Sequence, residues 1–466
     1  MTDLSEEQAI ALERFKSGSN LFITGAGGSG KTLLIHHLVE HAKSTGKKVQ
    51  VCALTGCASI LLGCSAKTIH SWSGIKLARG SIEDIVAQVS RNRQAKKKWR
   101  AVQVLIIDEV SMMSRKIFDA LEAVARHTRN NPFPFGGIQV VFCGDFYQLP
   151  PIPTASEPET GEFCFESDQW HTIFHPKNHI ELKTIFRQTD TKYIEILSQV
   201  RVGELSQENA DILKQYVKRE YDETKNNGAC LTKLFPIRSR VDYVNKMMFD
   251  KIEEPTTKCE IIKYRNCTTY LETNKPIIPS VLQTCREMTK QEIDAELEQL
   301  IANTPCIPDL ELKRGASVMC TVNLDMEKGI CNGSQGIITD FIDRTPVVKF
   351  ANGTTLPIGY HSWQSEDYPI VAISGFPLQL SWALTIHKIQ GATLGSAQID
   401  IGNGVFEYGQ TYVALSRIKS LEGLYLSGFN PNRIKANPKV REFYDNIRQQ
   451  SSLSDDVRLV QFAFKI

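Results

Sequence analysis

A glycine-rich segment near the start of the chain places the strongest limit on its fold. Residues 25–32 read Gly-Ala-Gly-Gly-Ser-Gly-Lys-Thr, and they follow the apolar run Leu21–Ile23. Glycines allow backbone N–H groups to converge on an anion, and a following helix places its positive N-terminus under the same group. The order strand, loop and helix is typical of a P-loop. It predicts an α/β fold with a parallel sheet that binds a nucleoside triphosphate.

Residue types in this loop have distinct tasks in binding a triphosphate. Lys31 is expected to neutralise the β- and γ-phosphates, and Thr32 to present its hydroxyl to Mg²⁺. The backbone of the other loop residues forms the predicted phosphate cradle: Gly25, Ala26, Gly27, Gly28, Ser29 and Gly30. The loop therefore predicts a nucleotide and Mg²⁺ as cofactors.

A second apolar run, Val104–Ile107, ends in the carboxylates of Asp108 and Glu109. Beside a P-loop, Asp108 is placed to hold Mg²⁺ and Glu109 to polarise the attacking water. The same pair could cap a helix, but the P-loop favours hydrolysis. A third run, Val140–Cys143, leads to Gln148, whose amide could sense the γ-phosphate.

Length and composition limit the remaining possibilities. The chain has 466 residues, a formal net charge of +2 and 12 cysteines. Several domains are expected at this length, and a nucleic-acid site would have to be a local basic track. The cysteines form no Cys-x-x-Cys pair, which is typical of reduced thiols in an intracellular protein. We see no signal peptide and no apolar run of about 18 residues, so we expect neither secretion nor a membrane partner.

The apolar patterns divide the chain into two α/β blocks that bracket inserted material. Short β-rich runs, with Asn332-Gly333 and Asn352-Gly353 as turns, predict a small antiparallel sheet or barrel over about 312–360. Thr289 and Glu292 form a predicted capping box before a helix. The predicted divisions are residues 1–180, residues 181–255 with 365–466, and residues 256–364.

Short motifs occur along the chain in the order of one known series. They are Leu4–Gln8, Gly25–Thr32, Thr68–Trp72, Ile107–Met112, Gly144–Pro151, Phe186–Gln188, Leu384–Gly391 and Tyr412–Arg417. Together they resemble the PIF-type (petite integration frequency) DNA helicases, in the RecD/Dda-like branch of superfamily one. The resemblance covers about residues 4–429. It implies two RecA-like domains with a small wedge insertion at 77–100, which use ATP and Mg²⁺ to travel 5′ to 3′ on single-stranded DNA and unwind forks.

The resemblance also implies roles for residues around the nucleotide. Gln8 would recognise adenine, and Gln390 and Gly391 would line the nucleotide site. Arg187 and Arg417 would act as arginine fingers that reach across from the second motor domain, an effect worth about 10³–10⁵ in rate in comparable phosphoryl transfers. Gln148 would couple the γ-phosphate to movement, with Lys31, Asp108 and Glu109 in the roles already given.

A further set of residues is expected to contact DNA. The resemblance assigns Thr55, His70, Thr385 and His387 to the strand. Trp72 and Tyr147 lie within motif loops, where they could stack on bases, worth ~1–3 kcal/mol each, or simply pack in the core. The basic stretch 91–100 falls where the family carries its wedge, and we expect phosphate contacts from Lys96, Lys97 and Lys98, although a solvated face would look the same.

Other activities remain open. The same motor residues would serve a DNA-stimulated ATPase that remodels protein–DNA complexes without separating strands. A RecD/Dda-like helicase is another alternative, but Gly144–Pro151 and Phe186–Gln188 favour the PIF branch. An inactive scaffold is disfavoured because the catalytic residue types are present. We expect a monomeric motor for DNA replication, repair, recombination or telomere maintenance, located wherever DNA is replicated, in a nucleus or in the cytoplasm of a prokaryotic or virus-infected cell.

Overall fold

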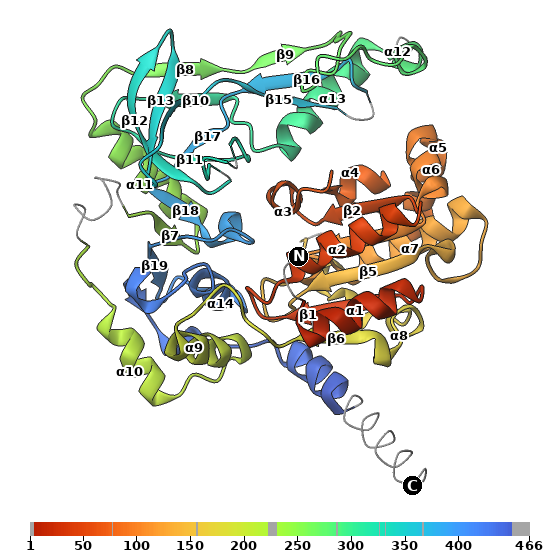
Figure 1. The fold of residues 1–466 in the computed structure, drawn as a ribbon, viewed down its shortest axis with the longest axis horizontal. Coiled ribbons are helices and arrows are strands. Elements are labelled where there is room, and N and C mark those ends of the chain that lie inside the picture. The colour runs from red at the N-terminus through yellow and green to blue at the C-terminus, as the bar shows by residue number, and fades with distance from the viewer. Residues whose placement is uncertain are drawn as a thin grey trace. The chain divides into compact units, whose positions relative to one another are not determined.

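The computed structural model describes residues 4–449, except for 77, 155–156, 222–230, 286–287, 326, 331 and 366–367. Position 77, where the predicted wedge begins, and residues 450–466 of the predicted second motor domain therefore lie outside the described residues. The chain packs as two compact units (Figure 1). Unit 1 contains Met1–Val217 and Ile401–Ile466, and unit 2 contains Lys218–Asp400.

Unit 1 is built on a six-stranded parallel sheet with the order β3-β2-β4-β5-β1-β6. The strands are β1 (Leu21–Gly25), β2 (Val49–Ala53), β3 (Lys67–Thr68), β4 (Val104–Asp108), β5 (Gln139–Gly144) and β6 (His179–Leu182). Alternate residues enter different cores: Leu21 packs with the helix residue Leu38, whereas Phe22 packs with Phe118 from another helix. Both faces are thus covered by helices, which explains why these strands read as continuous apolar runs.

The helices of unit 1 alternate with its strands along most of the chain. They are α1 (Glu6–Lys16), α2 (Lys31–Ser44), α3 (Gly56–Leu62), α4 (Ile69–Ser73), α5 (Ile82–Arg91), α6 (Arg93–Ala101), α7 (Arg115–Arg129), α8 (Trp170–Ile173), α9 (Thr191–Val202), α10 (Gln207–Gln215) and α14 (Gln410–Leu415). The strand β20 (Leu424–Phe429) follows, and residues 438–449 are helical. The sequence-based prediction of an α/β parallel sheet is confirmed.

The inserted segment before β4 is a pair of short helices, α5 and α6. Asn92 ends α5, and its side chain accepts the N–H of Ala95 to cap α6. Trp99 anchors the pair, since its indole N–H donates to the Ser73 carbonyl at 2.9 Å and its ring lies 4.7 Å from that of Trp72. The role of this insertion as a wedge stays a prediction.

Burial of Trp72 generates a stability prediction. The ring is 2% exposed and packs in the core of unit 1, so Trp72→Ala should lower the free energy of unfolding by about 3–5 kcal/mol, measured by chemical denaturation. Phe133→Ala, at a ring that is 67% exposed, is the control and should change little. Unchanged stability together with lost DNA binding would return Trp72 to a role in base stacking.

Unit 2 contains parallel and antiparallel strands. In the parallel part, β7 (Lys233–Phe235) pairs with β18 (Ala383–Thr385) and β19 (Ala397–Ile401). An antiparallel sheet has the order β14-β13-β12-β11-β17. Its strands are β11 (Ser317–Cys320), β12 (Gln335–Ile342), β13 (Thr345–Phe350), β14 (Thr355–Pro357) and β17 (Leu378–Leu380). The predicted antiparallel sheet over 312–360 is confirmed, and it recruits one further strand, β17, from outside that range.

The turns of this sheet explain its register. Gly353 has φ of 88° in the predicted Asn-Gly turn between β13 and β14. The turn between β12 and β13 uses Asp343 and Arg344, which both have positive φ values, 47° and 67°, as a type I′ turn requires. No glycine marks this turn, and sequence analysis did not identify it.

The remaining elements of unit 2 surround these sheets. They are α11 (Arg238–Asp250), β8 (Thr257–Glu260), β9 (Ile262–Tyr264), α12 (Pro279–Cys285), α13 (Lys290–Asn303), β10 (Asp309–Leu312), β15 (His361–Gln364) and β16 (Ala372–Gly375). The predicted capping box at Thr289 and Glu292 is confirmed at the start of α13. Among the described residues, no helix is long and apolar enough to cross a bilayer.

Candidate nucleotide site and nucleic-acid interface

The P-loop joins β1 to α2, as its sequence predicts. Gly28 and Gly30 have φ values of 89° and 81°, which favour glycine, and Gly30 begins α2 without a side-chain cap. Backbone N–H groups at such a helix start are suited to an anion. The Ser29 hydroxyl is buried and has no hydrogen-bond partner among the described residues. The loop therefore offers donors that a phosphate group would satisfy.

Lys31 lies folded over the loop. Its Nζ donates to the carbonyl of Gly25 at 2.7 Å and to that of Ala26 at 3.0 Å. Burial lowers the pKa of Lys31, while Asp145, Glu109 and Asp108 act in the opposite direction. A half-buried ammonium beside the loop is suited to neutralising a phosphate, because a charge partly withdrawn from water attracts an anion more strongly.

The two carboxylates at the end of β4 lie in different environments. Asp108 is buried, and burial, followed by the charge of Glu109, raises its pKa to about 7. The Glu109 N–H donates to Asp108 Oδ1 at 2.8 Å, and Glu109 has a left-handed φ of 55°. Such a conformation costs a non-glycine residue about 1–3 kcal/mol and is typical of functional positions. Asp108 and the exposed Thr32 supply the hard oxygen ligands that Mg²⁺ prefers.

Gln8 connects α1 to the P-loop. Its Oε1 accepts the N–H of Ser5 at 2.9 Å as part of a capping box, and its Nε2 donates to the Gly30 carbonyl at 3.2 Å. The side chain is fully buried. The structure thus places Gln8 beside the phosphate loop, and its predicted recognition of adenine stays a prediction.

The structure brings both predicted arginine fingers to the loop. Arg417 Nη2 would lie 3.5 Å from a Cβ added to Gly27, and its guanidinium donates to the Val413 carbonyl at 2.9 Å and to the Ser416 hydroxyl at 2.7 Å. Arg187 Nη1 donates to the Ser416 carbonyl at 3.1 Å. Burial lowers the pKa of both arginines, and that of Arg417 falls to about 10, with the charge of Arg187 as a second cause.

A buried ion pair lies behind the end of β5. Arg201 on α9 donates to both carboxylate oxygens of Asp145 at 2.9 Å. Gln148 follows three residues later; it is buried, and its Oε1 has no hydrogen-bond partner in the described part of the chain. Sequence analysis missed Arg201, whose only signal is a basic residue next to the apolar positions of an amphipathic helix.

Tyr444, in the helix at 438–449, was also missed. Its hydroxyl lies 2.6 Å from Thr24 Oγ1 and accepts the Phe146 N–H at 3.1 Å. Its ring stacks on Tyr147 at 4.8 Å between centroids, and the Arg201 guanidinium lies 4.8 Å from the Tyr147 ring centre. A C-terminal helix thereby supports the loop that carries Gln148.

These contacts correct the expectation for two aromatic residues. Tyr147 is 4% exposed between Tyr444 and Arg201, and Trp72 is covered by Trp99. The structure therefore does not support base stacking by either ring, because their faces are already used in packing.

Other predicted DNA contacts lie near strand ends. In unit 1, Thr55 follows β2 and accepts the Ala58 N–H, and the partly buried His70 follows β3, with its Nδ1 2.7 Å from the Lys76 carbonyl. The paired residues Ala53 and Thr68 place these two segments side by side. In unit 2, four predicted residues follow one another at and after the end of β18: Thr385, His387, Gln390 and Gly391.

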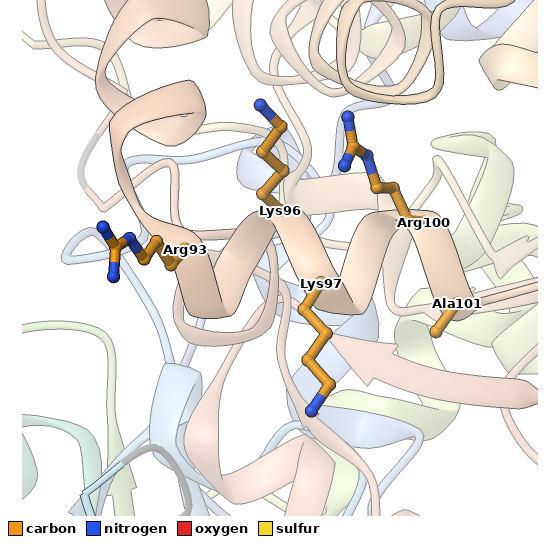
Figure 2. A pocket seen from close by; sticks show the side chains of 5 residues that line it. All are labelled: Arg93, Lys96, Lys97, Arg100 and Ala101. Atoms are coloured by element: carbon orange, nitrogen blue, oxygen red, sulfur yellow. The ribbon is translucent and has the colours of Figure 1, made fainter. Parts of the chain in front are cut away.

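The predicted basic stretch forms the outer surface of α6. Arg93, Lys96, Lys97 and Arg100 line a surface hollow together with Ala101. Figure 2 shows Lys96 and Arg100 projecting from one side of the helix and Lys97 from the opposite side. Because Trp99 is buried beneath, the cations cover a helix whose other face is held in the core.

The Asp145–Arg201 pair leads to a second prediction. Arg201→Met should lower the free energy of unfolding by about 3–5 kcal/mol, since a buried carboxylate would lose its partner. Chemical denaturation measures this loss. Lys214→Met, which breaks the exposed pair with Asp211, is the matched control and should cost about 1 kcal/mol or less. Equal losses of unfolding free energy in both variants would show that the buried pair is no more costly to break than the exposed pair.

Comparisons with known proteins find related sequences. The model of the PIF1-like helicase family matches residues 3–211, and that of the DNA helicase Pif1 2B domain matches residues 297–341. The chain is 34% identical to "ATP-dependent DNA helicase PIF1" of Danio rerio and 33% identical to that of Homo sapiens, in each case over 97% of this chain. It spans 66% and 65% of the lengths of these relatives, just under two thirds.

Solved structures are also similar. The crystal structure of Pif1 helicase from Candida albicans has a TM-score of 0.76 and 33% identity, and covers 96% of this chain and 100% of that one. A Bacteroides Pif1 in complex with ADP-AlF4 has a TM-score of 0.72 and 27% identity, over 97% of this chain and 98% of that one.

Proposed function

This chain belongs to the PIF1-like helicase family, and from that premise we propose that it is an ATP- and Mg²⁺-dependent DNA helicase that travels 5′ to 3′ on single-stranded DNA. The observation that supports this most directly is the meeting of Lys31, Arg187 and Arg417 at the P-loop. Three cations at one loop suit the charge that develops when a phosphoryl group is transferred.

Each of these groups has a separate part in the proposed hydrolysis. Bound ATP and Mg²⁺ supply the phosphoryl group and its charge neutralisation. Glu109 would take the proton that leaves the attacking water. Asp108 and Thr32 would hold the metal. Arg187 and Arg417 stabilise negative charge at the same end of the loop.

The proposed DNA partner is a single strand or a fork. A Bacteroides Pif1 has been solved bound to single-stranded DNA, and another structure describes unwinding at forked DNA by two coordinating Pif1 helicases. For this chain we assign the strand to Thr55, His70, Thr385 and His387. We further propose motor domains at 1–180 and at 181–255 with 365–466, a division that differs from the two compact units of the fold. The motor would act as a monomer wherever the host replicates its DNA.

Glu109→Gln tests the proposed chemistry. The amide keeps the size of the side chain but cannot take a proton, so ATP turnover and unwinding of a forked duplex should fall by about 10²–10⁴, while nucleotide and single-strand binding remain. Lys31→Ala should abolish turnover. Unwinding that survives in Glu109→Gln would contradict the assignment of the base.

The same assay separates the alternative function. A translocase that only remodels protein–DNA complexes would displace streptavidin from a biotinylated single strand and hydrolyse ATP, yet leave a fork annealed. Strand separation by the wild-type protein, lost in Glu109→Gln, excludes this alternative.

The basic surface of α6 gives a prediction about salt. Replacement of Lys96, Lys97 and Lys98 by Ala should weaken DNA binding and flatten its dependence on salt by about 0.7–0.9 in log–log slope for each lost phosphate contact. Fluorescence anisotropy over a salt series measures this. A control with Lys16, Lys43 and Lys48 changed to Ala removes the same charge elsewhere in unit 1. An equal change in the control would show that net charge, not a phosphate contact, is responsible.

A further inference from the structure

A tyrosine hydroxyl is bonded to the P-loop itself. The N–H of Gly27 donates to the hydroxyl oxygen of Tyr412 at 2.7 Å. Tyr412 lies on α14 and is 2% exposed. Gly27 is in the part of the loop whose N–H groups form the proposed phosphate cradle, so a side chain of this protein already occupies one of the donors that a P-loop directs at phosphate.

The same residue of the loop is covered by the turn that follows Tyr412. A Cβ added to Gly27 would lie 3.4 Å from the side chain of Ser416 and 3.5 Å from Arg417 Nη2. Arg417 is in turn held by Val413, also on α14. The Tyr412 hydroxyl and the proposed finger Arg417 therefore approach one point of the loop from one helix and the turn after it.

The hydroxyl is a weaker partner for this N–H than a phosphate oxygen would be. Burial, followed by the charge of Asp145, raises the pKa of Tyr412 to about 12, so the phenol is neutral at physiological pH. Hydrogen bonds to an ionised acceptor are roughly twice as strong as those between neutral groups. A phosphate can therefore displace the hydroxyl, but it must give up part of its binding free energy to do so.

We propose that Tyr412 competes with the terminal phosphate of the nucleotide for the Gly27 N–H, so that α14 distinguishes a triphosphate from a diphosphate. This inference rests on the proposed nucleotide function. Because Arg417 follows the same helix, displacement of the Tyr412 hydroxyl and placement of the arginine at the terminal phosphate are parts of one movement. Tyr412 is thus a positioning residue for Arg417.

Tyr412→Phe tests the proposal, because it removes the hydroxyl and keeps the buried ring. Equilibrium binding of the fluorescent analogues mant-AMP-PNP and mant-ADP is measured with Mg²⁺ and without DNA. The variant should bind the triphosphate about 2- to 10-fold more tightly than wild type, the effect of one net hydrogen bond, and change its affinity for the diphosphate by less than about twofold.

Tyr193→Phe is the matched control. Tyr193 is also fully buried, and its hydroxyl donates to the Leu415 carbonyl at 2.8 Å, so it contacts the same helix without reaching the P-loop. This variant should bind mant-AMP-PNP and mant-ADP with the same affinities as the wild-type protein. Circular dichroism melting sets a temperature at which all three proteins are folded.

The outcomes separate the possible roles. Unchanged or weaker triphosphate binding in Tyr412→Phe overturns the proposal, as does equal tightening of both nucleotides. Weaker binding of both with a lower melting temperature assigns Tyr412 a purely structural role and overturns it too. Failure of the wild-type protein to bind either analogue would instead refute the nucleotide function on which the proposal rests.

Discussion

The order of strands in the parallel sheet is the constraint on which the site depends. Since β4, β5 and β1 are neighbours, their carboxyl ends meet at one edge. The P-loop, the Asp108–Glu109 pair and the Asp145–Gln148 turn are therefore neighbours as well, although they are far apart in the sequence. Lys31 is half-buried near Asp108, Glu109 and Asp145, and the charges of these carboxylates offset part of the desolvation of its ammonium.

Support for this edge also comes from Arg201 and Tyr444, which lie outside the recognised motifs. The Asp145–Arg201 pair is bidentate and buried, and Tyr444 bonds Thr24 of β1 as well as the backbone that follows β5. A buried ion pair contributes little net stability compared with apolar packing, but breaking it is costly. Here the pair connects the turn that leads to Gln148 to α9.

Sequence reasoning succeeded where local patterns decide the structure. It placed the strands of the parallel sheet, the P-loop, the capping box at Thr289 and the antiparallel sheet of unit 2. It listed Trp72 and Tyr147 among the candidate DNA contacts, with core packing as the alternative, and the structure supports the packing. An aromatic residue in a motif loop gives the same sequence pattern in both cases. Sequence reasoning did not identify Arg201 and Tyr444, since their hydrogen-bond partners are 56 and 420 positions away in the chain.

Sequence patterns alone were enough to predict the types of chemical group: a phosphate loop, a candidate metal-binding carboxylate, a candidate base and two candidate arginine fingers, each within a short motif. Which of these groups are in contact follows from the packing of the folded chain. Hydrogen bonds such as Gly27 to Tyr412 join positions 385 residues apart. Such pairings depend on how whole helices and strands pack, and the free energy of packing is shared among many contacts that no short stretch of sequence contains.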